Sequence, residues 1–402
     1  MVPDIFHRDF KPSPCWWEAY APKAGDLVEV PRTARVAIVG GGYAGLSAAL
    51  EFAKNGIDAV VLEANELGFG ASTRNGGAVS GGVNIGKSFT GRTSDIEPTR
   101  AERILSDAAD AFALIDRLIA EEEIACFWEK PGRFVGAWTR GHFAAQARRL
   151  ALLNAAAQSG AYMVPRERQR EEIASDYYFG GMVVERSGKL HPALYYKGLL
   201  DACRRRGVTV CAKAAVNRLE RAGAGWRVET SRGVVSVGEV VIATNGYTGG
   251  LTPALRRRVV PIASHIIATE ELPYDLARSL IPKRRTLLRH KARAVLLPDV
   301  ARRQPNGVRR PCTFHASRPD RQRADPLPLH DRPFPATARV QSDPCVDRQC
   351  RVHLRCTAAY GRARRPLLLS RLQRQRRRDD DLSRLADRAQ DRSGRQLRLQ
   401  LG

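Results

Sequence analysis

Three glycines, Gly40, Gly42 and Gly45, have the spacing G-x-G-x-x-G within residues 35–64. The chemistry that needs this spacing is the binding of a dinucleotide pyrophosphate. The first glycine permits a tight turn, the second lets the backbone approach the pyrophosphate, and the third lets a helix pack closely on a strand. The N–H groups from Gly42 to Ala44 would then face the phosphates from the amino end of that helix. These residue types and their spacing predict a dinucleotide site.

The elements that must position such a site surround the three glycines. An apolar run at 36–39 predicts a strand before the turn, and residues 46–53 carry apolar side chains at helical spacing after it. Gly56 follows as the stop signal of that helix. A second apolar run at 59–62 ends at Glu63, which is placed to accept hydrogen bonds from a ribose hydroxyl. A glycine-rich turn alone also occurs without a ligand, but the strand, the helix and the acid together favour the dinucleotide site.

A second glycine-rich stretch, GFGASTRNGG at residues 68–77, follows the first unit. Glycine and small polar residues bury little apolar surface. They can bring backbone N–H groups and the guanidinium of Arg74 close to an anionic or planar ligand. Taken alone, this composition is typical of a flexible surface loop.

Together, the two stretches resemble the FAD-dependent oxidoreductases of the D-amino-acid oxidase (glycine/sarcosine oxidase) superfamily, most closely the γ-glutamylputrescine oxidase-like branch. The resemblance implies that FAD is the cofactor, with its pyrophosphate at the first glycine turn and its adenosine ribose at Glu63. It also implies further cofactor contacts. Near the pyrophosphate or the isoalloxazine ring it places residues of the second stretch: Ser72, Thr73, Arg74, Asn75, Gly76 and Gly77. It places Val216 near the adenine, and Thr244, Asn245 and Gly246 at the end of a late strand that passes near the FAD.

The resemblance also implies a reaction, the two-electron oxidation of a C–N bond in an amine or amino acid. The flavin would take the hydride and O₂ would reoxidise it. The sequence identifies no catalytic side chain and no metal site. His191 could titrate near neutral pH, but a histidine before Pro192 at a helix start favours a structural role.

The expected fold is α/β, a Rossmann-type FAD-binding domain interleaved with a substrate domain that has a mixed or antiparallel sheet. We expect both parts within residues 34–286, after a lead-in at 1–33. Helices are predicted at 98–121, 142–157 and 194–205, and a hairpin at 126–138. An aromatic cluster in the lead-in, Trp16, Trp17 and Tyr20, is predicted to pack against the domain surface.

Composition adds expectations about location and partners. The start, Met-Val-Pro-Asp, lacks the pattern of a signal peptide, and no apolar run approaches the ~20 residues needed to span a bilayer. The eight cysteines show no paired zinc spacing, so reduced thiols are expected. We therefore expect a cytoplasmic protein with a small-molecule substrate and no membrane partner.

The net charge of +24 is concentrated toward the end of the chain. Residues 291–402 hold 26 Arg, one Lys, 11 Asp and no Glu, and only four of the 34 glycines. No periodicity survives beyond a few residues after Thr286. The resemblance stops there, and we expect residues 287–402 to be an irregular, disordered tail.

Three interpretations of this tail compete. Clustered guanidinium groups could neutralise phosphate, so a basic nucleic-acid-binding protein is the alternative function if the tail is genuine. A disordered basic tail would contain more Glu, Lys and Ser. A shifted reading frame in a GC-rich gene explains both the Arg and the Pro. Read one nucleotide later, the codons of residues 372–380 allow Cys-Asn-Gly-Ser-Gly-Val-Ala-Met-Met, which resembles a glycine-rich cofactor segment of the family, and we favour this interpretation.

The frameshift generates a prediction about the chain as written. It should fold poorly and show little or no oxidase activity, because a domain with ~5–15 kcal/mol of net stability cannot lose core strands without unfolding. Restoring the frame just after Thr286 should return flavin affinity and turnover, measured by flavin absorbance and oxygen consumption. Early stop codons in the alternative frame would contradict it. So would a well-folded 402-residue product that oxidises amines at ordinary enzyme rates.

Overall fold

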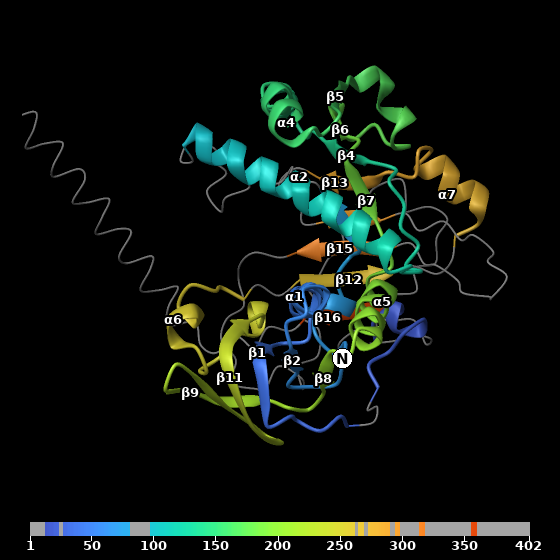
Figure 1. Cartoon of the computed structure of the whole chain (residues 1–402). Helices are drawn as coiled ribbons and strands as arrows, with labels where there is room; N and C mark the ends of the chain where they lie inside the picture. Colours follow the sequence, from blue (N-terminus) through green and yellow to red (C-terminus); the bar gives the residue numbers. More distant parts are fainter. Residues whose placement is uncertain are drawn as a thin grey trace, which may run out of the picture. The chain divides into compact units, whose positions relative to one another are not determined.

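The computed structural model describes residues 13–23, 27–80, 97–261, 264–268, 272–289, 294–297, 313–317 and 355–359. In this part of the chain two large sheets and a two-stranded ribbon are formed (Figure 1). Strands of the two large sheets alternate along the sequence. This confirms the predicted α/β fold, in which a Rossmann-type unit is interleaved with a second, mixed sheet.

The first sheet has six strands and contains the predicted dinucleotide unit. Its order is β8 (Thr209–Cys211), β2 (Ala59–Leu62), β1 (Thr33–Val39), β11 (Gly233–Ile242), β10 (Gly225–Thr230) and β9 (Val216–Ala222). The first four strands are parallel, and β10 and β9 complete the sheet as an antiparallel meander. All four residues of β2 are buried, as expected for a parallel strand covered on both faces.

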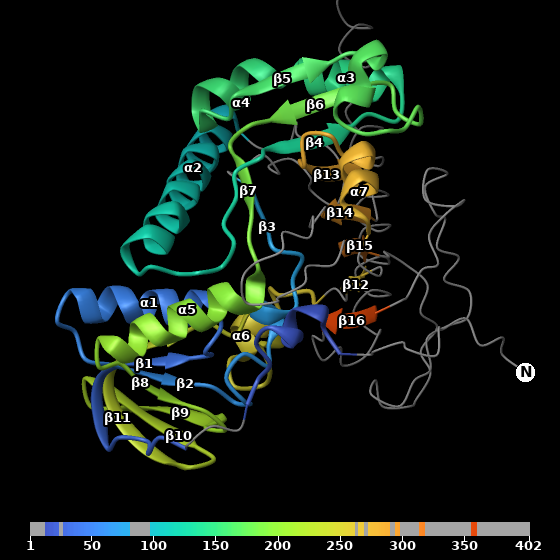
Figure 2. The ribbon, with the colours of Figure 1, turned by 90° about the vertical axis from the view of Figure 1, so that its right-hand side faces the viewer.

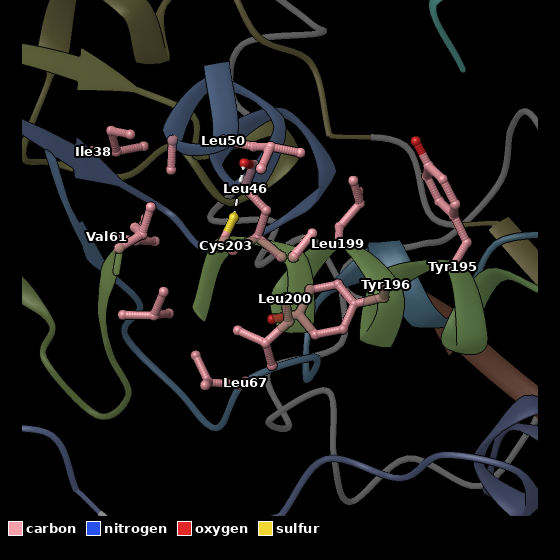
Figure 3. Close-up of a cluster of buried hydrophobic side chains, with 14 of the residues drawn as sticks. Ile38, Leu46, Leu50, Val61, Leu67, Tyr195, Tyr196, Leu199, Leu200 and Cys203 are labelled. Atoms are coloured by element: carbon pink, nitrogen blue, oxygen red, sulfur yellow. Dashed lines mark hydrogen bonds between the residues drawn. The ribbon is translucent and has the colours of Figure 1, made fainter. Parts of the chain in front are cut away.

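Helices α1 (Tyr43–Lys54) and α5 (Pro192–Arg205) lie side by side over this sheet (Figure 2). Leu46 and Leu50 of α1 pack with Leu199 of α5 in a core that excludes water (Figure 3). The Cys203 thiol donates to the Leu46 carbonyl oxygen at 3.2 Å, and burial raises its pKa to about 12. This thiol therefore packs and hydrogen-bonds in its protonated form.

The start of α5 agrees with the predicted structural role of His191. Its Nδ1 accepts a hydrogen bond from the Leu194 N–H at 3.2 Å, as an N-cap residue does. Pro192 occupies the first helical position, where its missing N–H costs nothing.

The second sheet has eight strands, with mixed pairing as predicted. Among the described strands of this sheet, only β4 and β13 pair in parallel. The order is β16 (Arg355–Ala359), β12 (Ser264–Ala268), β15 (Thr313–Ser317), β14 (Ala294–Leu297), β13 (Thr286–Arg289), β4 (Arg133–Gly136), β6 (Gly181–Val184) and β5 (Ala161–Val164). The ribbon of β3 (Ala78–Ser80) and β7 (Ser187–Lys189) runs between the two sheets (Figure 2).

The remaining described helices belong mainly to the second sheet. They are α2 (Pro98–Glu121), α3 (Arg140–Ala147), α4 (Leu150–Ala157), α6 (Pro253–Arg256) and α7 (Tyr274–Leu280). The bounds of α2 are those predicted. Among the helices described, none combines the length and the apolar character needed to cross a bilayer.

Two local predictions are wrong. Residues 126–138 do not form a hairpin, because β4 pairs with β6 and β13 from elsewhere in the chain. A Pro-Gly turn signal beside a strand-like run predicts a strand but does not determine its partner. The helix predicted at 142–157 is divided between α3 and α4. The break lets Gln146 donate from its amide to the Val135 carbonyl oxygen at 3.1 Å while Leu153 enters the core.

Most of residues 287–402 lies outside the described residues. Within that range the structure describes the end of β13 and the backbone strands β14, β15 and β16. The irregular and disordered character of this segment, and its origin in a shifted frame, stay predictions.

A buried carboxylate follows the end of α2. The side chain of Glu122 is 4% exposed and bonds Arg206 at 2.9 Å and Lys54 at 3.2 Å. Burial alone would raise the pKa of Glu122, but the hydrogen bonds from Arg206 and Lys54 outweigh burial and hold the pKa below its ordinary value. A lowered carboxyl pKa stabilises the folded state above the unfolded-state pKa, about 4.3.

The Glu122→Gln variant should therefore lose about 1.5–3 kcal/mol of unfolding free energy at neutral pH, since it removes charged hydrogen bonds from a buried site. The loss should shrink as pH falls from the unfolded-state pKa toward the lowered folded-state pKa of Glu122, below which the parent carboxyl is protonated in both states. Urea unfolding followed by tryptophan fluorescence at neutral and acidic pH measures both values. Glu121→Gln is the matched control, because this exposed neighbour also pairs with Lys54, at 2.8 Å. An equal loss in both variants would contradict the special role of Glu122.

Candidate functional site

The candidate site lies where β1, β2 and β11 end at one edge of the first sheet. The register places Val39 opposite both Leu62 and Ile242, so the residues that follow each strand leave the sheet at the same level. The neighbours of β1 come from different parts of the chain, which makes this edge a topological switch point. Ligands of open parallel sheets bind at such points.

Two glycines of the first motif have the conformation or close contact expected of them. Gly40 has φ of +109°, and a Cβ on it would lie 2.7 Å from the Ala243 carbonyl oxygen. A Cβ on Gly45 would lie 1.9 Å from the Gly40 carbonyl oxygen, so α1 rests directly on the turn. At Gly42 the nearest atom to a Cβ is the Ser72 Oγ, at 3.0 Å. The turn thus requires Gly40 and the packing requires Gly45, while the role of Gly42 in cofactor binding stays a prediction.

The amino end of α1 offers hydrogen-bond donors. The Tyr43 N–H donates to the Ser72 Oγ at 3.0 Å. In the part of the chain that the structure describes, the N–H groups of Ala44 and Gly45 have no acceptor. Such groups at the positive end of a helix dipole suit an anion, and a pyrophosphate fits this end of α1.

Glu63 lies against the same turn. Its carboxylate accepts hydrogen bonds from the N–H of Gly41 at 2.8 Å and of Asn65 at 3.0 Å. The Ala214 N–H donates to the Glu63 carbonyl oxygen at 2.8 Å, so the chain that leads to Val216 passes beside Glu63. The structure therefore brings this acid, the glycine turn and the start of β9 to one place.

In the second glycine-rich stretch, which we call the 68–77 loop, two predicted cofactor residues hold the loop itself. Thr73 is fully buried, and its hydroxyl donates to the Gly68 carbonyl oxygen at 2.6 Å. The Asn75 amide donates to the Ser72 carbonyl oxygen at 2.9 Å and accepts from the Gly77 N–H at 2.8 Å. Thr73 and Asn75 thus act on the shape of the loop, while Ser72 reaches the amino end of α1.

Close packing explains Gly77. A Cβ there would lie 2.2 Å from the Leu190 carbonyl oxygen, and the Leu190 N–H donates to the Gly77 carbonyl oxygen at 2.9 Å. With Gly76 before it, Gly77 leads the loop into β3, next to the connection from β7 to α5.

The segment after β11 reaches the same loop. The Thr244 and Thr248 hydroxyl groups are 2.7 Å apart, and Asn245 begins a single 3₁₀ turn that contains Gly246 and Tyr247. The Tyr247 ring is 3.7 Å from the Cβ position of Gly70. Burial raises the pKa of the Tyr247 hydroxyl. The structure thus gathers both glycine-rich stretches and residues 244–246 around the amino end of α1.

Three aromatic residues of this region were not predicted to belong to the site: Trp17, Tyr43 and Tyr247. Trp17 was expected to pack on the domain surface, and the surface on which it packs is the 68–77 loop. The Tyr43 hydroxyl donates to the Pro192 carbonyl oxygen at 2.8 Å, and burial raises its pKa. The motif itself could have pointed to Tyr43, one of its variable positions. Nothing local links Trp17 to a loop some fifty residues later. Among the described residues, no His, Cys, Asp and Glu side chains form a group that could hold a metal ion.

Comparison with known proteins finds related oxidoreductases. Gamma-glutamylputrescine oxidoreductase of Escherichia coli (strain K12) is 33% identical over 272 residues, which cover 66% of this chain and 61% of that protein. A probable oxidoreductase OrdL of Haemophilus influenzae is 31% identical over 260 residues, covering 62% of this chain and 58% of that protein. The chain thus spans about three fifths of the length of the curated relatives it matches.

Solved structures share the fold. L-proline dehydrogenase from P. horikoshii superposes with a TM-score of 0.56 at 15% identity, covering 71% of this chain and 70% of that one. Glycine oxidase from Geobacillus kaustophilus also gives 0.56, at 17% identity, covering 74% and 75%. The family model described as DAO, FAD dependent oxidoreductase, matches residues 35–332, more than half of the 402 residues. This chain therefore belongs to the DAO family of FAD-dependent oxidoreductases.

Proposed function

We propose that the protein to which this sequence belongs is an FAD-dependent oxidoreductase that oxidises the C–N bond of an amine or amino acid. The observation that carries the proposal is the meeting of two glycine-rich segments at the amino end of α1, in a chain of the DAO family. When bound, FAD supplies a two-electron acceptor for the hydride of the carbon next to nitrogen. We propose O₂ as the final electron acceptor.

The residues present fit FAD. The Ala44 and Gly45 N–H groups would hold the pyrophosphate, and Gly42 leaves space for it. Glu63 would hold the adenosine ribose through a carboxylate that now bonds two backbone N–H groups. Val216, the 68–77 loop and residues 244–246 would complete the contacts. This assignment of the site is a proposal, which the mutations below test.

The substrate class comes from the relatives. One curated relative is named for gamma-glutamylputrescine, an amine, and two structures of the same fold are named for proline and glycine. All three named compounds contain an amine nitrogen bonded to a carbon that can be oxidised. A γ-glutamylated diamine is the substrate that we place first, because that relative has the highest sequence identity of the three.

A second candidate, an inactive flavin-binding fragment, is favoured by two observations. The chain spans about three fifths of its curated relatives. Its residues 291–402 have the Arg-rich composition described above. We also propose a cytoplasmic location, which is supported by Cys203 and Cys211, both buried and in no disulfide, because disulfides are rare in cytosolic proteins.

The proposed function is tested with the purified protein and its frame-restored form, each mixed with FAD. The visible flavin spectrum reports binding, and anaerobic bleaching of that spectrum reports reduction. We expect bleaching by γ-glutamylputrescine or another amine in the frame-restored form, with weak or no bleaching in the 402-residue form. Hydroxy acids and glycerol phosphate serve as controls. Bleaching by these alone, or no flavin in either form, would contradict the proposal.

The Gly42→Val variant should lose FAD binding, because the added side chain occupies the approach of the pyrophosphate to the backbone. Flavin absorbance after gel filtration measures the loss. Gly250→Val is the matched control, since a Cβ at Gly250 meets nothing within 4 Å. Parent-like affinity in Gly42→Val would show that the pyrophosphate lies elsewhere.

The Glu63→Ala variant should bind FAD about 1–3 kcal/mol more weakly, the cost of leaving buried hydroxyl groups without their acceptor. Fluorescence titration with FAD measures the dissociation constant. Glu66→Ala is the control, because Glu66 is a carboxylate three residues away that pairs with Lys213 at 3.6 Å. If both variants bind equally well, Glu63 does not contact the cofactor.

A further inference from the structure

Two adjacent tryptophans near the start of the described chain connect helix α5 with the 68–77 loop. Trp16 is 2% exposed, and its ring meets the His191 imidazole edge-on, with centroids 4.7 Å apart. Trp17 follows in the same 3₁₀ turn (Cys15–Glu18) and donates from its indole Nε1 to the Thr73 Oγ1 at 2.9 Å. Trp16 therefore holds the 3₁₀ turn against the start of α5, and Trp17 hydrogen-bonds the 68–77 loop.

The indole bond ends at the residue that closes the loop. The Thr73 hydroxyl accepts from Trp17 and donates to the Gly68 carbonyl oxygen, so one buried oxygen links the lead-in to both ends of residues 68–73. Thr73 directly follows Ser72, whose Oγ accepts from the Tyr43 N–H at the amino end of α1. A displaced Thr73 would displace Ser72 with it.

Trp17 also contacts the next residue of the loop through its ring. The guanidinium carbon of Arg74 lies 4.7 Å from the centroid of the Trp17 ring and 4.3 Å from that of Phe69. An arginine stacked on aromatic faces is held by cation–π attraction as well as by packing. Trp17 thus contacts two consecutive residues, Thr73 by hydrogen bond and Arg74 by its ring.

We propose that Trp17 is a positioning residue for the cofactor, holding the 68–77 loop in its binding shape before FAD arrives. A loop rich in glycine loses much conformational entropy when it is ordered, and ordering it in advance removes that cost from binding. The inference rests on the proposed function, since it takes the 68–77 loop to be part of the FAD site.

The test compares three variants, each made in the 402-residue chain and in its frame-restored form. Trp17→Phe keeps an aromatic face for Arg74 and removes the indole N–H, and Trp17→Leu removes both. Trp226→Leu is the matched control, because Trp226 carries an equivalent arginine stack, with Arg221 at 4.2 Å, on the β9–β10 hairpin. Amide hydrogen exchange of the 68–77 loop is measured without FAD, and the FAD dissociation constant by fluorescence titration.

We expect Trp17→Phe to weaken FAD binding about threefold to tenfold, the effect of one lost hydrogen bond. Trp17→Leu should weaken it about tenfold to a hundredfold, because the arginine stack is lost as well. Exchange of the loop amides should quicken in the same order, while α1 amides keep the parent's protection. Trp226→Leu should leave both quantities unchanged.

Parent-like loop exchange in Trp17→Leu would overturn the inference, whatever the FAD affinity. An equal loss of affinity in Trp226→Leu would also overturn it, since the effect would then be one of general stability. If neither the 402-residue parent nor its frame-restored form takes up FAD, the proposed function fails, and the positioning of a cofactor by Trp17 fails with it. The exchange measurement would still decide whether Trp17 orders the loop, so the two failures are distinguishable.

Discussion

The contact between Gly45 and the Gly40 carbonyl oxygen constrains the rest of the described structure. Because a Cβ at Gly45 would lie only 1.9 Å from that oxygen, α1 can rest on the end of β1 only with glycine there. This close approach places the amino end of α1 at the edge of the first sheet where β2 and β11 also end. It also fixes the position of α1, on which α5 packs through the contact of Cys203 with Leu46.

Predictions from the sequence succeed where the determining interactions are local. The bounds of α2 and the role of His191 follow from helical spacing, from Pro98 and Pro192, and from a cap within three residues. Predictions fail where a distant partner decides. Strand β4 follows a Pro-Gly turn signal that favours a hairpin, but its neighbours start at residues 181 and 286.

The same distinction between local and distant interactions applies to the residues of the candidate site. Gly40, Gly45 and Glu63 lie within one β–α–β unit, where spacing fixes geometry, and the structure gathers them as predicted. The side chains of Thr73 and Asn75 match a cofactor motif, yet their polar atoms bond the loop and its neighbours. A motif records which residues a loop contains, and the tertiary structure decides which of them support it from within. Trp17 shows the converse, since its partner is distant in sequence.

The residues just before the Arg-rich segment are joined to the second sheet by charge as well as by backbone pairing. Arg284 bonds Glu129 at 2.9 Å, and Lys283 and Arg285 both pair with the fully buried Glu172, at 2.7 and 2.8 Å. A buried carboxylate without such partners would be destabilising. Residues 283–285 therefore supply the cationic partners that Glu129 and Glu172 need, which indicates that these three residues are read in the same frame as the rest of the folded chain. These ion pairs place residues 283–285 with the second sheet, and the family model matches farther along the chain, to residue 332.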